Sequence, residues 1–464
     1  MPSFPVRAED AVFLHAQTLT CPQQVGAVVM LNGPGVDLAA LRSSVAARVG
    51  QLPELRRRLI PARGRWARPR WAVDEYVDVR ARVTEITSAG ALLTSLEQIV
   101  GQYFAEPVDP AEAAWQLLLV RAAPGGPSAI VVKAHHALGD SYALISALSG
   151  LFDPQDPRPR SVSPRGPGGF GGTGSPSKTR GAGRIVPPMK HGAGTALRVV
   201  RGLAGMSLAA PPSLIGVDGG VAGHYREFAA VNLDARMVAI KARLLGAGTV
   251  DFVLAVAADA LGQLMAERGQ AAVGRTVRAM VPCSLRSAGR PPDRGGAPVQ
   301  AATSGGENGD GTGPGNRTTG MLLDLPVGPM SLVERVAAVQ GGRQARQRRG
   351  DADASAFVLH AMNLLPPPLQ RAIARTSFTS RRFSLIVSVF PGTRKPRRLL
   401  GAEVTEVFPV LALADGVGLA LGAMTWGRSL SIGIMANPAL IPDVALMAAS
   451  IRNAFSADDP GSAG

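Results

Sequence analysis

Lysine, aromatic residues and cysteine are all scarce in this chain of 464 residues. Only five of its 49 basic side chains are lysines, and aromatic residues make up 5% of the composition. Proteins that bind single-stranded nucleic acid use aromatic rings to stack on bases, and no zinc-finger or RNA-binding signature occurs either. We therefore expect no nucleic-acid partner. The formal net charge of +15 instead favours an anionic ligand or an anionic membrane face.

The chain also lacks a disulfide framework and an uninterrupted membrane-spanning run. Its two cysteines, Cys21 and Cys283, indicate a reducing compartment, and Cys283 ends an apolar strand, where we expect it to pack. Acidic residues precede the first apolar run, so no signal peptide is expected. The weakly charged stretch 407–426 contains Asp415 and three glycines and should form buried strands. We expect a cytoplasmic protein, free or peripheral to the inner face of the cell membrane or to lipid inclusions.

The length and the apolar content of 46% are enough to fill two hydrophobic cores. The spacing of apolar residues predicts strands at 24–31, 115–120, 129–133 and from 228, and helices at 36–49, 92–104 and 250–268.

Two stretches interrupt this periodicity. Residues 153–188 and 288–315 are rich in glycine and proline and carry no regular apolar spacing, so we expect a partly disordered linker and a long loop. A basic amphipathic helix is predicted between them, at 190–208. We therefore divide the chain into an N-terminal unit (1–152), a linker region (153–225) and a C-terminal unit (226–464).

The polar residues best suited to catalysis cluster where a predicted strand ends. The apolar strand 129–133 leads into His135, His136, Gly139, Asp140 and Ser141, and helical spacing follows. A strand-to-helix junction faces a cleft in many α/β proteins. Adjacent histidines on an extended backbone point to opposite sides, so only one of them can face a substrate. We interpret the cluster as catalytic rather than as a pair of ordinary loop histidines.

Two other chemistries are alternatives for these residues. A metal site is disfavoured, because adjacent histidines do not readily share one ion and no third ligand lies at the right spacing. A serine hydrolase is the second alternative, since 139–143 approaches the G-x-S-x-G nucleophile elbow with Ser141 as the nucleophile. Its triad histidine would come from His191, His224 or His360. That motif ends here in Ala143 instead of glycine, and it leaves the histidine pair unexplained.

Arginine-rich segments raise the further alternative of a non-enzymatic protein at a lipid surface. Arginines alternate with tryptophans across 56–71, and four more arginines lie on a helix-like stretch at 343–349. Such faces suit an anionic membrane. We expect instead that both runs are solvated charged faces, which is the usual role of a charge run. The G-x-G-x-x-G match at 169–174 follows no strand, so nucleotide binding is not expected there.

The cluster at 135–141 resembles the HHxxxDG motif of the acyl-CoA-dependent acyltransferases, which include chloramphenicol acetyltransferase-like enzymes and condensation domains. The surrounding sequence is more specifically similar to the bacterial wax ester synthase/diacylglycerol acyltransferase (WS/DGAT) family. The similar blocks follow the family's order along nearly the whole chain: AEDAVFLHAQTLTCPQQVGAVVML, LPELRRRLIP, RPRWAVDEYVDV, EPVDPAEAAWQLLLV, VPCSLR, PGNRTTGMLLDLP, SVFPG and FPVLALADGVGLAL.

The resemblance implies an α/β fold of two chloramphenicol acetyltransferase-like subdomains, with mixed sheets flanked by helices and a central tunnel. The alternation of predicted strands and helices agrees with that fold. The resemblance also implies transfer of a long-chain acyl group from acyl-CoA to the hydroxyl of diacylglycerol or a fatty alcohol. The product would be triacylglycerol or wax ester. Acyl-CoA is then a substrate, and no cofactor or metal is implied.

Roles for individual residues follow from the same resemblance. His136 would take the proton of the acceptor hydroxyl as it attacks the thioester, which suits a neutral imidazole. His135 would support it, and Asp140 would brace the loop by pairing with Arg286. Asn316 and a loop at 388–392 would shape the tunnel. The complete substrate-binding set is Gly139, Ser141, Arg286, Asn316, Pro391 and Gly392.

Three positions depart from the family's pattern. Ser141 replaces the motif's last glycine, Ala114 replaces the leucine before Trp115, and 388–392 replaces an Asn-Val-Pro-Gly-Pro-like block. If position 141 requires a positive φ, serine would be strained by roughly 1 kcal/mol, which lowers turnover without abolishing it. A weakly active homologue with a non-lipid acceptor is therefore a further alternative.

Overall fold

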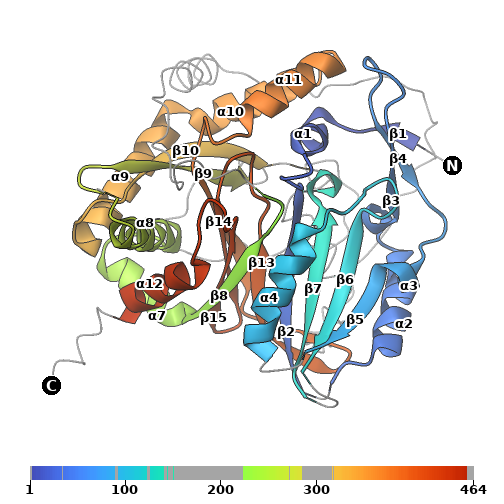
Figure 1. The fold of residues 1–464 in the computed structure, drawn as a ribbon, viewed down its shortest axis with the longest axis horizontal. Helices are drawn as coiled ribbons and strands as arrows, with labels where there is room; N and C mark the ends of the chain where they lie inside the picture. The colour runs from blue at the N-terminus through green and yellow to red at the C-terminus, as the bar shows by residue number, and fades with distance from the viewer. Residues whose placement is uncertain are drawn as a thin grey trace, which may run out of the picture.

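The structure is a computed structural model that describes residues 3–33, 35–88, 92–122, 126–139, 144, 150, 223–270, 272–284, 316 and 318–456. Two six-stranded sheets form the body of the protein, each with helices against it, and a three-stranded sheet lies at the N-terminal side (Figure 1). Both large sheets mix parallel and antiparallel pairs. The predicted α/β class, with mixed sheets flanked by helices, is confirmed.

The first large sheet belongs mostly to the N-terminal half. Its strands, in spatial order, are β12 (Arg398–Leu399), β13 (Ala402–Val410), β2 (Gln24–Asn32), β7 (Ser128–His135), β6 (Trp115–Arg121) and β5 (Val83–Thr87). Side chains alternate between its faces. Val28 and Val131 pack on α4 (Leu92–Ala105), whereas Val29 and Val132 pack on the side of α2 (Leu38–Val49). Every residue of β7 is buried because both faces of the sheet are covered.

Helix α2 shows why the predicted elements form where they do. Asp37 accepts a hydrogen bond from the backbone N–H of Ala40 and so caps the first turn. Leu41, Val45 and Val49 recur every four residues and are the buried side chains of the helix. The helix begins two residues after its predicted start. The small sheet packs near the same face and consists of β1 (Ser3–Pro5), β4 (Arg70–Val73) and β3 (Arg57–Ile60).

The second large sheet belongs to the C-terminal half. Its strands, in spatial order, are β10 (Thr318–Pro326), β9 (Thr276–Ser284), β11 (Leu385–Thr393), β14 (Leu419–Trp426), β15 (Ser429–Ala436) and β8 (Glu227–Asp234). Helices α7 (Ala235–Leu244), α8 (Thr249–Glu267), α9 (Leu332–Arg349) and α12 (Val444–Ser456) pack with it. Among the described residues α8 is the one helix apolar and long enough to cross a membrane, but 72% of that window is buried in the core. The stretch 407–426 forms β13 and β14, as predicted.

Strand β13 joins the two large sheets. It pairs with β2 in the first sheet, and its Pro409 lies against β14 and β15 of the second. Gly422 and Gly433 face each other across β14 and β15. A Cβ on Gly433 would lie 2.1 Å from the carbonyl oxygen of Pro409, so only glycine permits this approach. A division of the chain at residue 226 therefore does not separate the two sheets, and the predicted unit boundaries stay predictions.

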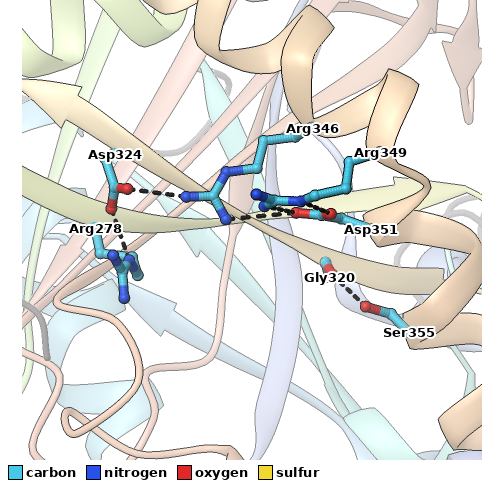
Figure 2. A network of polar contacts seen from close by, with 7 residues as sticks. All are labelled: Arg278, Gly320, Asp324, Arg346, Arg349, Asp351 and Ser355. Carbon is cyan, nitrogen blue, oxygen red and sulfur yellow. Dashed lines mark hydrogen bonds and ion pairs between the residues drawn. The ribbon is translucent and has the colours of Figure 1, made fainter. Parts of the chain in front are cut away.

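Arg346 and Arg349 of α9 are paired with carboxylates, so the predicted solvated face at 343–349 is wrong for them, whereas Arg348 is exposed as predicted. Arg346 contacts both Asp324 and Asp351, and Arg349 binds both carboxylate oxygens of Asp351 at 2.7 Å (Figure 2). Asp324 also accepts a hydrogen bond from Arg278 at 2.6 Å. Asp351 is 3% exposed, and a buried carboxylate requires such partners. The network holds the start of α10 (Asp351–Met362) against β9 and β10.

Two further arginines are not solvated either. Arg343 of α9 binds Asp251, whose side chain is buried in α8. In the run at 56–71, Arg57 is buried with its guanidinium over the ring of Phe4. The prediction of a solvated face was wrong for these positions, because a charge pattern does not show which side chains lie between packed layers.

Several predictions fall on residues that the structure does not describe. These are the linker at 153–188, the basic helix at 190–208 and the glycine-rich stretch at 288–315. They stay predictions.

Gly433→Ala should lower the free energy of unfolding by about 2–4 kcal/mol, because the new methyl meets a backbone carbonyl that cannot rotate away. Gly341→Ala is the matched control, since a Cβ there meets nothing within 4 Å on helix α9. It should leave stability unchanged or raise it by up to about 1 kcal/mol. Urea unfolding of both variants measures the difference, and equal effects would contradict the close crossing of β13.

Candidate active site

The histidine pair lies where β7 ends. His135 is the last residue of the strand, and a 3-10 turn, η2 (His136–Leu138), begins at His136. Ala137 and Leu138 are buried in the N-terminal core, which fixes the turn. Gly139 follows with φ 168° and ψ 166°, an extended conformation open to any residue. Asp140 and Ser141, which complete the predicted cluster, lie outside the described residues, as does Arg286.

Both ring nitrogens of His135 are engaged in hydrogen bonds. Its Nδ1 accepts from the backbone N–H of Ala137 at 3.0 Å, and its Nε2 lies 2.6 Å from Oε1 of Gln17. An amide oxygen can only accept, so Nε2 carries the proton and the ring is the neutral Nε2–H tautomer. Burial, and secondarily the charge of His136, lower the pKa of His135 to about 3. His135 is therefore a neutral structural group.

His136 is half-buried and is held at its backbone and at its ring. Its N–H donates to the carbonyl of Gln23 at 2.9 Å, and its own carbonyl accepts from Nδ2 of Asn316 at 3.0 Å. Its ring stacks face to face on Phe13, with centroids 3.6 Å apart and planes 6° from parallel. Nδ1 of His136 is shielded from solvent, although the residue as a whole is only half-buried, so its exposed surface comes from other atoms. This arrangement limits the positions that the imidazole can take.

Asn316 links the histidine turn to helix α1 (Ala8–Ala16). Its backbone N–H and its Nδ2 both donate to Oδ1 of Asp10, at 2.8 and 2.7 Å, while Nδ2 also reaches His136. Two acceptors facing one amide group fix Nδ2 at that position. Burial raises the pKa of Asp10, and the two hydrogen bonds from Asn316 oppose that shift. Asn316 lies two residues before the start of β10, so a residue of the C-terminal half helps to hold the site.

Helix α1 supplies three contacts that the sequence analysis did not assign. Asp10, Phe13 and Gln17 lie three and four residues apart, so they share the face of the helix that meets η2. This spacing of a carboxylate, an aromatic ring and an amide is visible in the sequence. It was missed because the same pattern also fits an ordinary amphipathic helix.

A row of aromatic rings continues from the site into the C-terminal half. Phe13 meets Phe378 edge to face at 6.0 Å, and Phe378 meets Phe383 at 5.6 Å. Phe378 directly follows helix α11 (Pro367–Ser377), which packs on α1. The ring of Phe13, on which His136 stacks, is thus packed against rings from the C-terminal half of the chain.

The predicted loop at 388–392 is instead part of strand β11, and that prediction was wrong. A register shift between Phe390 and Thr393 interrupts its pairing with β14. A Cβ on Gly392 would lie 1.5 Å from the carbonyl oxygen of Thr425, so this glycine is needed for close backbone contact. A proline-glycine pair suggested a turn, but the strand accommodates both at the bulge. The atoms nearest to that Cβ belong to Thr425 and Met424 of β14, and the tunnel stays a prediction.

Other reactive groups in the described part of the chain show no catalytic arrangement. No group of three or more His, Cys, Asp or Glu side chains there could hold a metal ion. Both cysteines are free thiols, and burial raises their pKa, to about 11 for Cys21. Cys283 is half-buried, and its packing role stays a prediction.

The comparison with protein families decides the identity of this site. The model of the wax ester synthase/diacylglycerol acyltransferase catalytic domain matches residues 6–225, and the WS/DGAT C-terminal domain matches residues 314–457. The chain belongs to the WS/DGAT family. It is therefore an acyltransferase, and the histidine pair lies within the matched catalytic domain.

Curated relatives of this WS/DGAT protein agree with the assignment. A putative diacylglycerol O-acyltransferase of Mycobacterium tuberculosis is 27% identical over 96% of this chain and 88% of its own length. A probable diacylglycerol O-acyltransferase of the same organism is 23% identical over 96% of this chain and 94% of its own.

Solved structures show the same fold. The wax ester synthase/diacylglycerol acyltransferase from Marinobacter aquaeolei VT8 superimposes with a TM-score of 0.64 at 15% identity, over 98% of each chain. The starter condensation domain of rhizomide synthetase, solved in complex with C8-CoA, gives a TM-score of 0.59 at 15% identity, over 98% of this chain and 93% of that one. At these identities the likeness shows the fold alone.

The family membership sets aside the serine hydrolase alternative. Ser141 and His191 lie outside the described residues. His224 lies against the ring of Tyr225, and His360 is exposed on α10 with its Nδ1 beside the carbonyl of Ala356.

Phe13→Leu should lower turnover by about 10- to 100-fold, because it removes the flat surface that orients the His136 ring and leaves an apolar side chain in place. Phe378→Leu is the matched control. It removes a neighbouring ring that touches Phe13 at its edge, so its effect on turnover should be much smaller. Steady-state kinetics compares the two variants, and their melting temperatures show whether both remain folded. Wild-type turnover by Phe13→Leu would refute the role of Phe13 in orienting His136.

Stability should fall as the pH is lowered, partly because of His15. Burial, followed by the charges of Arg371 and Arg375, lowers the pKa of His15 from 6.5 to about 4. The folded state therefore binds fewer protons than the unfolded state between these values, and it loses stability as the pH falls from 6.5 to 4. His15→Leu should reduce the slope of the unfolding free energy against pH by up to about 1.4 kcal/mol per pH unit. Urea unfolding at pH 7.5, 6 and 5 tests this, and parallel curves would contradict it.

Proposed function

We propose that this protein transfers a long-chain acyl group from acyl-CoA to the hydroxyl of a lipid alcohol, with His136 as the general base. Diacylglycerol or a fatty alcohol is the acceptor, and triacylglycerol or wax ester is the product. Acyl-CoA is a substrate in this proposal, which includes no resident cofactor. The two free thiols support a cytoplasmic location as part of the same proposal.

One observation carries the assignment of the base. Of the two adjacent histidines, His135 is 1% exposed with both ring nitrogens engaged, whereas His136 is half-buried and stacked on Phe13. A general base must reach the proton that it removes, and only His136 is accessible to do so. The turn also fixes the backbone of His136 on both sides, which limits the positions of its ring.

The chemistry needs only these groups and the two substrates. The acceptor hydroxyl oxygen attacks the thioester carbonyl carbon while His136 Nε2 takes the hydroxyl proton. The carbon–sulfur bond then breaks, and the imidazolium returns the proton to the departing thiolate of CoA. An ester and a free CoA thiol leave, and the histidine is again neutral. No acyl-enzyme forms.

His136→Ala should lower turnover by on the order of 10²–10⁴-fold, the range for a lost general base. The protein is incubated with radiolabelled palmitoyl-CoA and either dipalmitoylglycerol or hexadecanol, and the esters are separated by lipid chromatography. Binding of palmitoyl-CoA should survive, because the imidazole acts on the acceptor proton.

Two controls separate catalysis from folding. His135→Ala should lower the melting temperature together with turnover, since it removes two buried hydrogen bonds. His360→Ala removes an exposed histidine of α10 and should change neither. Near-wild-type ester formation by His136→Ala, with both acceptors, would show that the base is another group.

A further inference from the structure

Three of the large apolar side chains that the structure exposes lie on two segments that are in contact with each other. Trp66, in the loop between β3 and β4, is 65% exposed. Leu364, between α10 and α11, is 85% exposed, and Leu369 on α11 is 46% exposed. In Figure 1 helices α10 and α11 lie at the top of the molecule above α1, beside the loop that joins β3 and β4. Exposed apolar groups of this size mark interaction surfaces when they gather together.

Hydrogen bonds join these two segments into one surface. Nη2 of Arg68, in the same loop as Trp66, donates to the carbonyls of Asn363 and Leu365 at 2.6 and 3.1 Å. These carbonyls flank Leu364. The loop and the α10–α11 junction therefore sit side by side, although they are about three hundred residues apart in sequence. We call the surface of Trp66, Leu364 and Leu369 the α10–α11 face.

The two chain segments that carry the α10–α11 face are basic. Neither 55–73 nor 354–402 contains an acidic residue, and each segment carries seven arginines. Some of these, such as Arg57, are buried, but Arg63, Arg65 and Arg375 are exposed. The guanidinium of Arg65 lies over the ring of Trp66, 5.4 Å from its centroid. Exposed apolar groups beside arginines are the pattern of a surface that inserts among anionic lipid headgroups.

We infer that the α10–α11 face docks the protein on an anionic phospholipid surface. Trp66 and Leu364 enter the boundary between headgroups and acyl chains, and the arginines contact the lipid phosphates. A protein partner of mixed charge is less suited to this face, because the segments 55–73 and 354–402 offer it only basic charges.

The position of the face connects docking with acyl transfer. Asn363 accepts a hydrogen bond through Oδ1 from the backbone N–H of Ala8 at 2.9 Å, and Ala8 begins helix α1. The same helix carries Asp10 and Phe13 of the histidine site. Docking here would place the site beside the bilayer that holds a lipid acceptor, and this connection rests on the proposed function. The inference that the face docks on lipid is independent of the proposed function.

Vesicle sedimentation tests the inference. Purified full-length protein is mixed with vesicles of phosphatidylglycerol and phosphatidylcholine, or of phosphatidylcholine alone. The wild type should bind the anionic vesicles, and added salt should weaken this binding. The double variant Trp66→Ala/Leu364→Asp should bind them at least about tenfold more weakly. Leu244→Asp, on α7 at 80% exposure, is the matched control and should bind like the wild type.

Each outcome bears on one of the two proposals. All variants are assayed with hexanoyl-CoA and hexanol, which need no lipid surface, and the double variant should form this ester at the wild-type rate. Absence of ester formation by the wild type from palmitoyl-CoA with both dipalmitoylglycerol and hexadecanol would overturn the proposed function while leaving the vesicle result intact. Docking through the α10–α11 face is overturned if the wild type does not bind anionic vesicles, if the double variant binds as well as the wild type, or if Leu244→Asp loses binding equally.

Discussion

Asn316 holds three distant segments of the chain at one point, and the arrangement of the site depends on this contact. Its amide nitrogens bind the buried carboxylate of Asp10 on α1, and its Nδ2 also binds the carbonyl of His136 at the end of β7. A buried carboxylate without donors would be costly, so Asp10 and Asn316 require each other. Because Phe13 lies on the same helix as Asp10, this contact also sets the ring on which His136 stacks.

The two sheets are arranged so that such a contact can form. Strand β13 comes from the C-terminal half but completes the N-terminal sheet, and it crosses β14 and β15 where Gly422 and Gly433 leave room for Pro409. Gln23, which is buried, adds a second connection. Its backbone carbonyl accepts a hydrogen bond from the N–H of His136, and its side-chain Nε2 donates to the carbonyl of Leu413. The histidine turn is thus bonded to both halves of the chain.

Much of this could be predicted from sequence, and the failures have physical causes. The strand that ends at the histidine pair and the helix with buried Leu41 and Val45 follow from apolar spacing, which local geometry dictates. The family resemblance supplied the fold and the acyltransferase activity. Long-range contacts were not accessible in this way. Strand β13 joins the N-terminal sheet by pairing with β2, which lies several hundred residues earlier in the chain. Nothing local in the sequence of β13 distinguishes it from any other strand.

The site was predicted in part for the same reason. Asn316 was expected near the substrate on the strength of the resemblance, and the structure places it against His136. Its partner Asp10 was not assigned, since a carboxylate in a first helical turn is common on any helix. Arg343 and its neighbours were predicted to be solvated because a sequence shows charge but not burial.

A crystal structure of the complex with a non-hydrolysable acyl-CoA analogue and hexadecanol would test the central claim most directly. We expect the hydroxyl oxygen of the alcohol to lie about 3 Å from Nε2 of His136, beside the carbon of the analogue that stands in for the thioester carbonyl carbon. The ring of His136 should remain stacked on Phe13. A complex in which the alcohol and the thioester meet beside Ser141, beyond the reach of His136, would contradict the role of His136 as the base.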